Sequence, residues 1–145
     1  MATGELSPKR LGEVFLDLSA VRTLVRQSLG CGCPESVFDH VVVGYPAVFE
    51  SVADEKAEVQ LLVGKRLLIS IIDLKIGYPK DSLIEQALRK GRDLRDRYGL
   101  NRFRLVLIGE PGEYPLEDWQ KRFCQDDRLH LHVLRKSELF SEIKK

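Results

Sequence analysis

Hydrophobic residues are densest between Ala57 and Lys75, where two apolar runs flank a short polar break. The runs 59–63 and 67–72 are rich in β-branched and aliphatic residues, and Gly64-Lys65 between them suits a tight two-residue turn. The second run is apolar at both of its alternating sets of positions, which is typical of a central strand covered on both faces. The pattern therefore predicts an antiparallel hairpin at the centre of a sheet.

The turn fixes which residues face each other across this hairpin. With Gly64-Lys65 as the loop, we expect Glu58 to face Ile71 and Lys56 to face Asp73. This register predicts Glu58 and Asp73 on one face of the sheet, as diagonal neighbours roughly 7–8 Å apart at the backbone.

The remaining elements follow from helical spacing and from alternation. Apolar residues three and four positions apart predict helices at 19–29 and 81–98, ended by Gly30 and Gly99. Gly91, inside the longer helix, is expected to permit close packing on the sheet. Shorter helices are expected at 115–124 and from 137 onwards, and further strands at 40–45, 102–108 and 129–134.

The resulting order is α-β-β-β-α-β-α-β-α, which predicts an α/β (α+β) fold with a mixed sheet of about five strands covered by helices. The helix at 81–98 joins two strands that we expect to be parallel, through a right-handed crossover. A length of 145 residues favours a single domain spanning 1–145. The polar residues 1–16 are expected to form a partly loose N-terminal segment, in which the apolar residues 14–16 could dock on the fold.

Composition narrows the function only slightly. The formal net charge of +1 argues against a protein whose main task is gripping nucleic acid. No apolar run reaches the length of a membrane span, and residues 1–10 contain no apolar signal core. Three cysteines, an odd number, fit reduced thiols, so we expect a cytoplasmic protein without a membrane partner.

One short motif resembles a nuclease family. Asp73-Leu74-Lys75 resembles the D-x-K element of the PD-(D/E)xK, or restriction-endonuclease-like, superfamily, whose core also runs α, three β, α, β. The resemblance implies a phosphodiesterase in which Glu58 and Asp73 hold Mg²⁺, Lys75 positions the attacking water, and Gln86 matches a glutamine of the following helix. The chain lacks a Pro-Asp pair ahead of the hairpin. The alternative is a polar strand end in which Lys56 pairs with Asp73.

The cysteines and histidines suggest a second chemistry. Cys31-Gly32-Cys33 is a thiol pair, and His130 and His132 share one side of a predicted strand. Together, with Cys124 as a further thiol, they predict a zinc or iron–sulfur site or a redox centre. The C-x-C spacing departs from the C-x2-C of structural zinc. The alternative is small buried cysteines and two surface histidines.

Basic residues are concentrated on the helix at 81–98 and on the strand after it. A phosphate-binding face is one interpretation, but Asp93 and Asp96 interleave with the arginines at i,i+4 spacing, which favours a solvated helix face. The basic residues are Arg89, Lys90, Arg92, Arg95, Arg97, Arg102 and Arg104.

We therefore expect, first, a small cytoplasmic binding or accessory module without catalysis that uses a cleft or a sheet edge for a protein or small-molecule partner. The first alternative is the Mg²⁺-dependent nuclease, for which nucleic acid would be the substrate. The second is a thiol-based metal-binding or redox protein.

Overall fold

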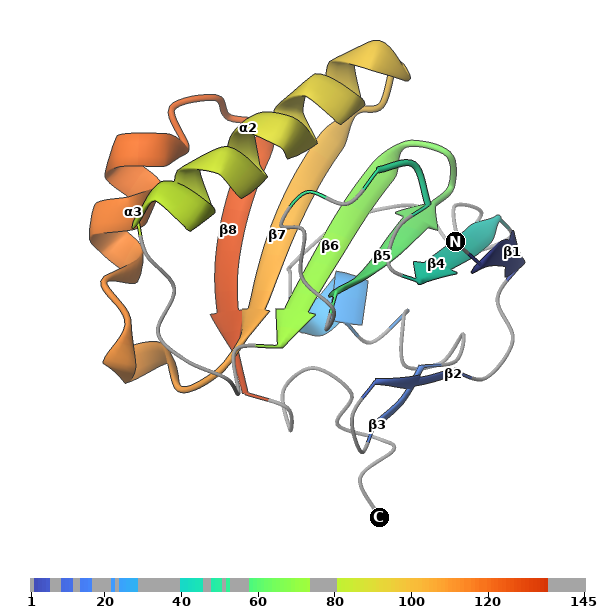
Figure 1. Cartoon of the computed structure of the whole chain (residues 1–145), viewed down its shortest axis with the longest axis horizontal. Helices are drawn as coiled ribbons and strands as arrows, with labels where there is room; N and C mark the ends of the chain where they lie inside the picture. Colours follow the sequence, from blue (N-terminus) through green and yellow to red (C-terminus); the bar gives the residue numbers. More distant parts are fainter. Residues whose placement is uncertain are drawn as a thin grey trace.

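A six-stranded sheet organises the described part of this computed structural model (Figure 1). The structure describes residues 2–5, 9–11, 14–16, 22, 24–28, 40–45, 48–50, 52, 58–73 and 81–135. The strands lie in the order β1-β4-β5-β6-β7-β8. Their bounds are β1 Ala2–Glu5, β4 Val41–Tyr45, β5 Glu58–Val63, β6 Leu67–Asp73, β7 Arg102–Ile108 and β8 Leu129–Leu134.

The sheet is mixed, which confirms the predicted fold class. From β1 to β6 each strand is antiparallel to its neighbour, whereas β6, β7 and β8 are parallel to one another. The parallel pairing of β6 with β7, expected from the helix that joins them, is confirmed. The five expected strands are present, and β1 adds a sixth at one edge.

The described residues of the 1–16 segment form three short strands, and these include 14–16, which were expected to dock. β1 pairs with β4, and β2 (Lys9–Leu11) pairs with β3 (Val14–Leu16) in a second, two-stranded sheet. These strands are only three or four residues long. Such short strands leave too few positions for an alternating pattern to be recognised, so pairing between backbones decides their structure.

The central hairpin is present, but its predicted register is wrong. Gly64 and Lys65 both have positive φ, as the expected turn requires. Arg66 also belongs to the loop, so the ladder closes with Val63 opposite Leu67. Glu58 therefore faces Ile72 instead of Ile71. A slip of one residue moves a position to the other face of the sheet.

Two helices cover one face of the sheet, α2 (Asp81–Arg97) and α3 (Leu116–Phe123) (Figure 1). The Phe103 ring of β7 occupies the space beside Gly91, where an added Cβ would lie 2.2 Å from the ring. This confirms the close packing expected at Gly91. Gly99 has a φ of +67° just beyond the helix, as a helix-ending glycine does.

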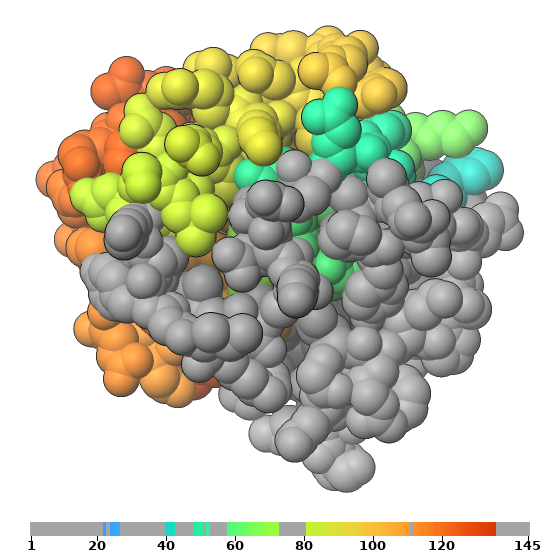
Figure 2. Space-filling view, in the orientation of Figure 1, coloured from blue at the N-terminus to red at the C-terminus, as the bar shows by residue number. Residues whose placement is uncertain are grey.

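The C-terminal end of α2 differs from expectation at one position. The apolar spacing of the helix predicts Tyr98 on the buried face with Leu94, four residues before it, but Tyr98 is 47% exposed. Its ring stacks on Phe49 with a centroid distance of 4.0 Å, and Figure 2 shows the segment around residue 49 against this end of α2. The neighbouring Arg97 pairs with Glu50 at 2.8 Å. The segment 48–50 thus rests on the end of the helix instead of leaving it bare.

The start of α2 is fastened to α3. The Trp119 side chain is fully buried, and its Nε1 donates a hydrogen bond to Asp81 Oδ1 at 2.9 Å. Arg122 pairs with the other oxygen of the same carboxylate. The hydrogen bonds from Arg122 and Trp119 hold the pKa of Asp81 below its ordinary value. This pairing fixes the angle at which the two helices meet.

The alternating residues of β7 and β8 divide cleanly between the two faces of the sheet. The side chains on the face that α2 and α3 cover are apolar. On the opposite face, the first positions along both strands carry arginine or histidine. The helix-covered residues are Phe103, Leu105, Leu107, Leu129, Leu131 and Val133. Those on the opposite face are Arg102, Arg104, His130 and His132, followed further along the strands by the apolar Val106, Ile108 and Leu134.

Two expected helices are described only in part or not at all. Of the helix predicted at 19–29, the structure describes Arg22 and a π-helix, η1 (Leu24–Ser28), whose Leu24 and Val25 are fully buried. A 3-10 turn, η3 (Pro111–Glu113), precedes α3. The helix predicted from 137 onwards lies outside the described residues. Within the described part of the chain, no helix is long and apolar enough to cross a membrane.

Candidate functional site

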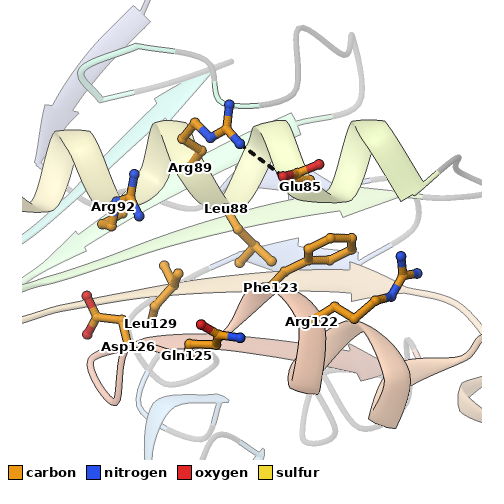
Figure 3. Close-up of a pocket in the computed structure, with 9 residues that line it drawn as sticks. All are labelled: Glu85, Leu88, Arg89, Arg92, Arg122, Phe123, Gln125, Asp126 and Leu129. Carbon is orange, nitrogen blue, oxygen red and sulfur yellow. Dashed lines mark hydrogen bonds and ion pairs between the residues drawn. The ribbon is translucent and has the colours of Figure 1, made fainter.

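A pocket opens between α2, α3 and the loop that leads into β8 (Figure 3). It encloses about 360 Å³. Leu88 of α2, Phe123 of α3 and Leu129 at the start of β8 give it an apolar floor, and Figure 3 shows Leu88 and Phe123 pointing toward one another. Arginines from both helices form its rim.

The arginines of the rim differ in how well they are neutralised. Arg89 pairs with Glu85 at 2.9 Å, and Arg122 pairs with both Asp81 and Asp118. Arg92 instead approaches a carboxylate only at 3.8 Å, in its chain neighbour Asp93, and no closer ion pair is recorded within the described ranges. Arg92 is therefore the guanidinium of the rim that is most available to a ligand.

The predicted solvated face of α2 needs a correction at Arg95. Its side chain is 3% exposed, and it pairs with Asp126 at 2.7 Å and with Asp96 at 2.9 Å. Burial lowers the pKa of Arg95, but the two carboxylates outweigh it, so the net shift is upward. Arg95 holds the loop before β8 against the helix. The expected i,i+4 pairs of Arg89 with Asp93 and of Arg92 with Asp96 are not among the ion pairs formed.

A second polar cluster, the Arg–His cluster, lies on the opposite face of the sheet. It consists of Arg102 and Arg104 of β7 with His130 and His132 of β8. Arg102 Nη1 lies 3.0 Å from His130 Nε2, and Arg104 Nη1 lies 2.9 Å from His132 Nε2. The four side chains thus form two matching cross-strand pairs, one above the other along the parallel ladder.

Burial sets the electrostatics of the Arg–His cluster. Arg104 is only 7% exposed, and its Nε has no hydrogen-bond partner. Burial, and then the charge of Arg102, lower the pKa of Arg104. Burial, followed by the charges of Arg104 and then His130, lowers the pKa of His132 to about 4. His130 shifts in the same direction, chiefly through burial. Both histidines are therefore neutral at pH 7.

A third polar group, the Glu58 network, lies on the helix-covered side of β5 and β6. Glu58 is 1% exposed, and its Oε2 accepts hydrogen bonds from Ser70 Oγ, Gln60 Nε2 and the backbone N–H of Val52. Gln60 also donates to the backbone oxygen of Glu50 at 2.8 Å. The network ties the 48–52 segment to the sheet, so its evident role is structural.

The register removes the geometric basis of the predicted nuclease site. Glu58 is in register with Ile72, and Asp73 is the next residue along β6, so their positions belong to opposite faces. The predicted shared face is wrong. On the Glu58 side, β6 carries Ser70 and Ile72, neither of which is an acid or a lysine. Gln86 is exposed on α2, and Lys75 lies outside the described residues. The catalytic roles of these four residues stay predictions.

The predicted metal site is described only in its histidine half. His130 and His132 do share one face, with ring centroids 6.4 Å apart. Cys31 and Cys33 lie outside the described residues, so a four-residue site stays a prediction. The residues that the structure describes contain no group of three or more His, Cys, Asp or Glu side chains that could hold a metal ion. Burial raises the pKa of Cys124 to about 11, so this thiol is protonated at neutral pH.

Neither the Arg–His cluster nor the pocket was predicted as a site from the sequence. Arg102 and Arg104 were expected on the ordinary polar side of a strand, and the histidines were considered either as metal ligands or as surface residues. The available signal was the matching alternation of Arg102-Phe103-Arg104 and His130-Leu131-His132, since parallel neighbours with the same alternation place their polar residues side by side. The pocket had no signal of this kind, because its lining comes from two helices and a loop.

The chain matches no protein-family model, no curated protein and no solved structure. The chemistry of its sites is therefore the basis for assigning a function.

Proposed function

We propose that this protein is a binding module that takes a small amphipathic anion in the pocket between α2 and α3. The observation that carries the proposal is the presence, in one pocket, of an apolar floor and a weakly neutralised guanidinium. Ligand pockets typically combine apolar lining with a few polar groups that fix orientation. Leu88, Phe123 and Leu129 would receive the apolar body, and Arg92 would bind the charged end.

The size of the pocket limits its ligand. A volume of about 360 Å³ lies near the lower end of the range of small-molecule sites, which is about 300–1,000 Å³. A body of one or two rings, or a short acyl chain, carrying a carboxylate, sulfonate or phosphate fits these limits. Gln125, on the loop at the rim, supplies an amide for a further hydrogen bond.

The pocket is a better candidate than the edge of the sheet. The β8 edge would have to offer free backbone groups to an added strand. Gln120 of α3 already donates a hydrogen bond to the backbone oxygen of Leu131 at 3.0 Å, and α3 packs on β8. This part of the edge is therefore occupied by the protein itself.

Binding is also a better account than nuclease catalysis. A divalent ion needs converging carboxylates, and Glu58 directs its Oε2 to three hydrogen-bond donors of the protein. The positions of β6 on its side offer Ser70 and Ile72 instead of a second acid. The pocket requires no residue to change its present partners.

Titration with anilinonaphthalene sulfonate, an amphipathic anion whose fluorescence rises in apolar surroundings, tests the proposal. We expect saturable binding at one site. Arg92→Gln should weaken it about threefold to tenfold, the equivalent of roughly 0.7–1.4 kcal/mol. Lys90→Gln is the matched control, since Lys90 is exposed on the same helix and does not line the pocket.

Backbone amide shifts of the labelled protein should place the bound dye. The proposal requires the largest shifts at Leu88, Phe123 and Leu129. Binding that does not saturate, equal weakening by Arg92→Gln and Lys90→Gln, or shifts centred on another surface would each overturn it.

A further inference from the structure

The Arg–His cluster holds more hydrogen-bond donors than acceptors. Arg102 Nη1 also donates to the backbone oxygen of Asp127 at 3.2 Å, whereas Arg104 Nε has no partner. A guanidinium group has five N–H donors and no acceptor. At 2.9–3.0 Å from the arginines, Nε2 of His130 and Nε2 of His132 must therefore accept these bonds. In a neutral imidazole whose Nε2 accepts, the proton is on Nδ1. Each histidine thus offers one further N–H donor, and the cluster as a whole exposes donors alone.

The cluster also lacks a counter-charge. In the described part of the chain no carboxylate forms an ion pair with Arg102 or Arg104. Asp126 and Asp127 act on His130 only as the weakest influences on its pKa, and Asp126 is engaged by Arg95. By contrast, the buried Arg95 has two carboxylate partners. A buried charge without a partner is unfavourable unless something neutralises it.

An anion can reach the cluster. Arg102, His130 and His132 are each partly exposed, whereas Arg104 lies deeper with its unpartnered Nε. Positive charge, an excess of donors and partial access together define a site for an oxygen-bearing anion, since charge-assisted hydrogen bonds from guanidinium to carboxylate or phosphate oxygens are the strongest of this type.

We infer that the Arg–His cluster on β7 and β8 is a second binding site, for the oxyanion group of a small molecule, with Arg104 and Arg102 as its principal ligand-binding residues. Phosphate and sulfate suit a cluster of several donor side chains best because they present several acceptor oxygens. The same two arginines would repel a metal cation, so this inference differs from the zinc site predicted from the histidines. It is independent of the pocket between α2 and α3, which lies on the other face of the sheet.

Calorimetric titration with inorganic phosphate, at constant ionic strength maintained with sodium chloride, tests the inference. The native chain should bind one phosphate. Arg104→Met, which keeps the apolar length of the side chain and removes the guanidinium, should weaken binding at least about tenfold, as expected for the loss of a charge-assisted contact. Lys90→Gln, an exposed lysine of α2 that lines neither site, should leave phosphate affinity unchanged.

Two further measurements complete the test. If Arg104→Met does not fold, the half-exposed Arg102→Gln tests the same site with less disturbance of the core, and should also weaken binding. Titration with adenosine monophosphate and with acetate distinguishes the source of the oxyanion. Tighter binding of the nucleotide than of inorganic phosphate, lost in Arg104→Met and kept in Arg92→Gln, assigns the group to a larger molecule, and equal binding assigns a free anion.

The inference is overturned if phosphate does not bind at constant ionic strength. It is also overturned if Arg104→Met, or Arg102→Gln in its place, binds phosphate as the native chain does. If Arg92→Gln loses phosphate binding and Arg104→Met keeps it, the anion occupies the pocket between α2 and α3. That result would overturn the inference and leave the proposed function standing.

Discussion

The two buried polar groups of this sheet are built on opposite principles. In the Glu58 network an acceptor meets its donors: Glu58 receives hydrogen bonds from Ser70, Gln60 and Val52. In the Arg–His cluster, donors outnumber acceptors: each histidine Nε2 accepts a hydrogen bond from an arginine, and the buried Nε of Arg104 has no partner. A satisfied polar group rigidifies a fold, whereas an unsatisfied one requires an explanation beyond the fold. The contrast therefore separates a structural network from a binding site.

The largest effect expected is from breaking the satisfied network. Glu58→Ala should lower the free energy of unfolding by about 3 kcal/mol, because Ser70 and Gln60 lose the acceptor of buried hydrogen bonds. Urea denaturation measures the loss. Glu117→Ala, an exposed glutamate of α3, is the control and should change stability little. A change in Glu58→Ala as small as that of the control would show that the network does not support the fold.

A smaller effect is expected from protonating the Arg–His cluster. The folded pKa of His132, about 4, lies below its ordinary value of 6.5, so between these values the unfolded chain binds more protons. Stability should consequently fall by about 2 kcal/mol as the pH drops from 6.5 toward 4, at roughly 1.4 kcal/mol per pKa unit with allowance for partial exposure.

Urea denaturation at pH 7 and pH 4.5 measures this fall. His132→Gln should flatten the dependence, since glutamine does not titrate. His130, whose pKa is also lowered, adds to the fall in the same direction, so the flattening is partial. Identical pH profiles for the native chain and His132→Gln would contradict the expected burial of this imidazole.

Packing on the helix-covered face sets a third effect. Gly91→Ala places a methyl group against the Phe103 ring, and this overpacking should lower the free energy of unfolding by about 2 kcal/mol. The higher helix propensity of alanine should raise it by about 1 kcal/mol. The variant should be less stable by about 1 kcal/mol, as measured by thermal or urea unfolding. Gly112→Ala meets nothing within 4 Å and serves as the control. A stabilised Gly91→Ala would show that the ring moves away freely.

The smallest effect on stability should come from Arg104→Met. Replacing a buried charge that lacks a carboxylate partner by an apolar side chain of similar length is often neutral or stabilising. In phosphate-free buffer we expect its unfolding free energy to lie within about 1 kcal/mol of the native value, or above it. A loss as large as that expected for Glu58→Ala would mean that Arg104 supports the fold, and the contrast between the two groups would disappear.

Local patterns predicted the fold well, because each element carries its own signals. Alternation located β7 and β8, and apolar spacing with Gly99 located α2. The register of the hairpin failed because it depends on whether Arg66 joins the loop, which the residues at the turn do not decide. That single slip produced the incorrect shared face for Glu58 and Asp73.

The candidate sites were less predictable, because they arise from contacts distant in sequence. The two Arg–His pairs each join residues 28 positions apart. Alternation shows that Arg104 and His132 avoid the helix-covered face, but it does not show how deeply the rest of the chain buries them. The partners of Arg95 were missed for the same reason, since Asp126 follows in another element.

Nitrogen-15 NMR of the histidine side chains tests the central contrast most directly. The chain has three histidines, and the exposed His40 is an internal control. We predict that at pH 7 His130 and His132 are neutral, with the proton on Nδ1, and that their signals shift with added phosphate whereas those of His40 do not. A proton on Nε2 in either residue would contradict its role as acceptor of the arginine hydrogen bond. Signals that phosphate leaves unchanged would contradict the oxyanion site.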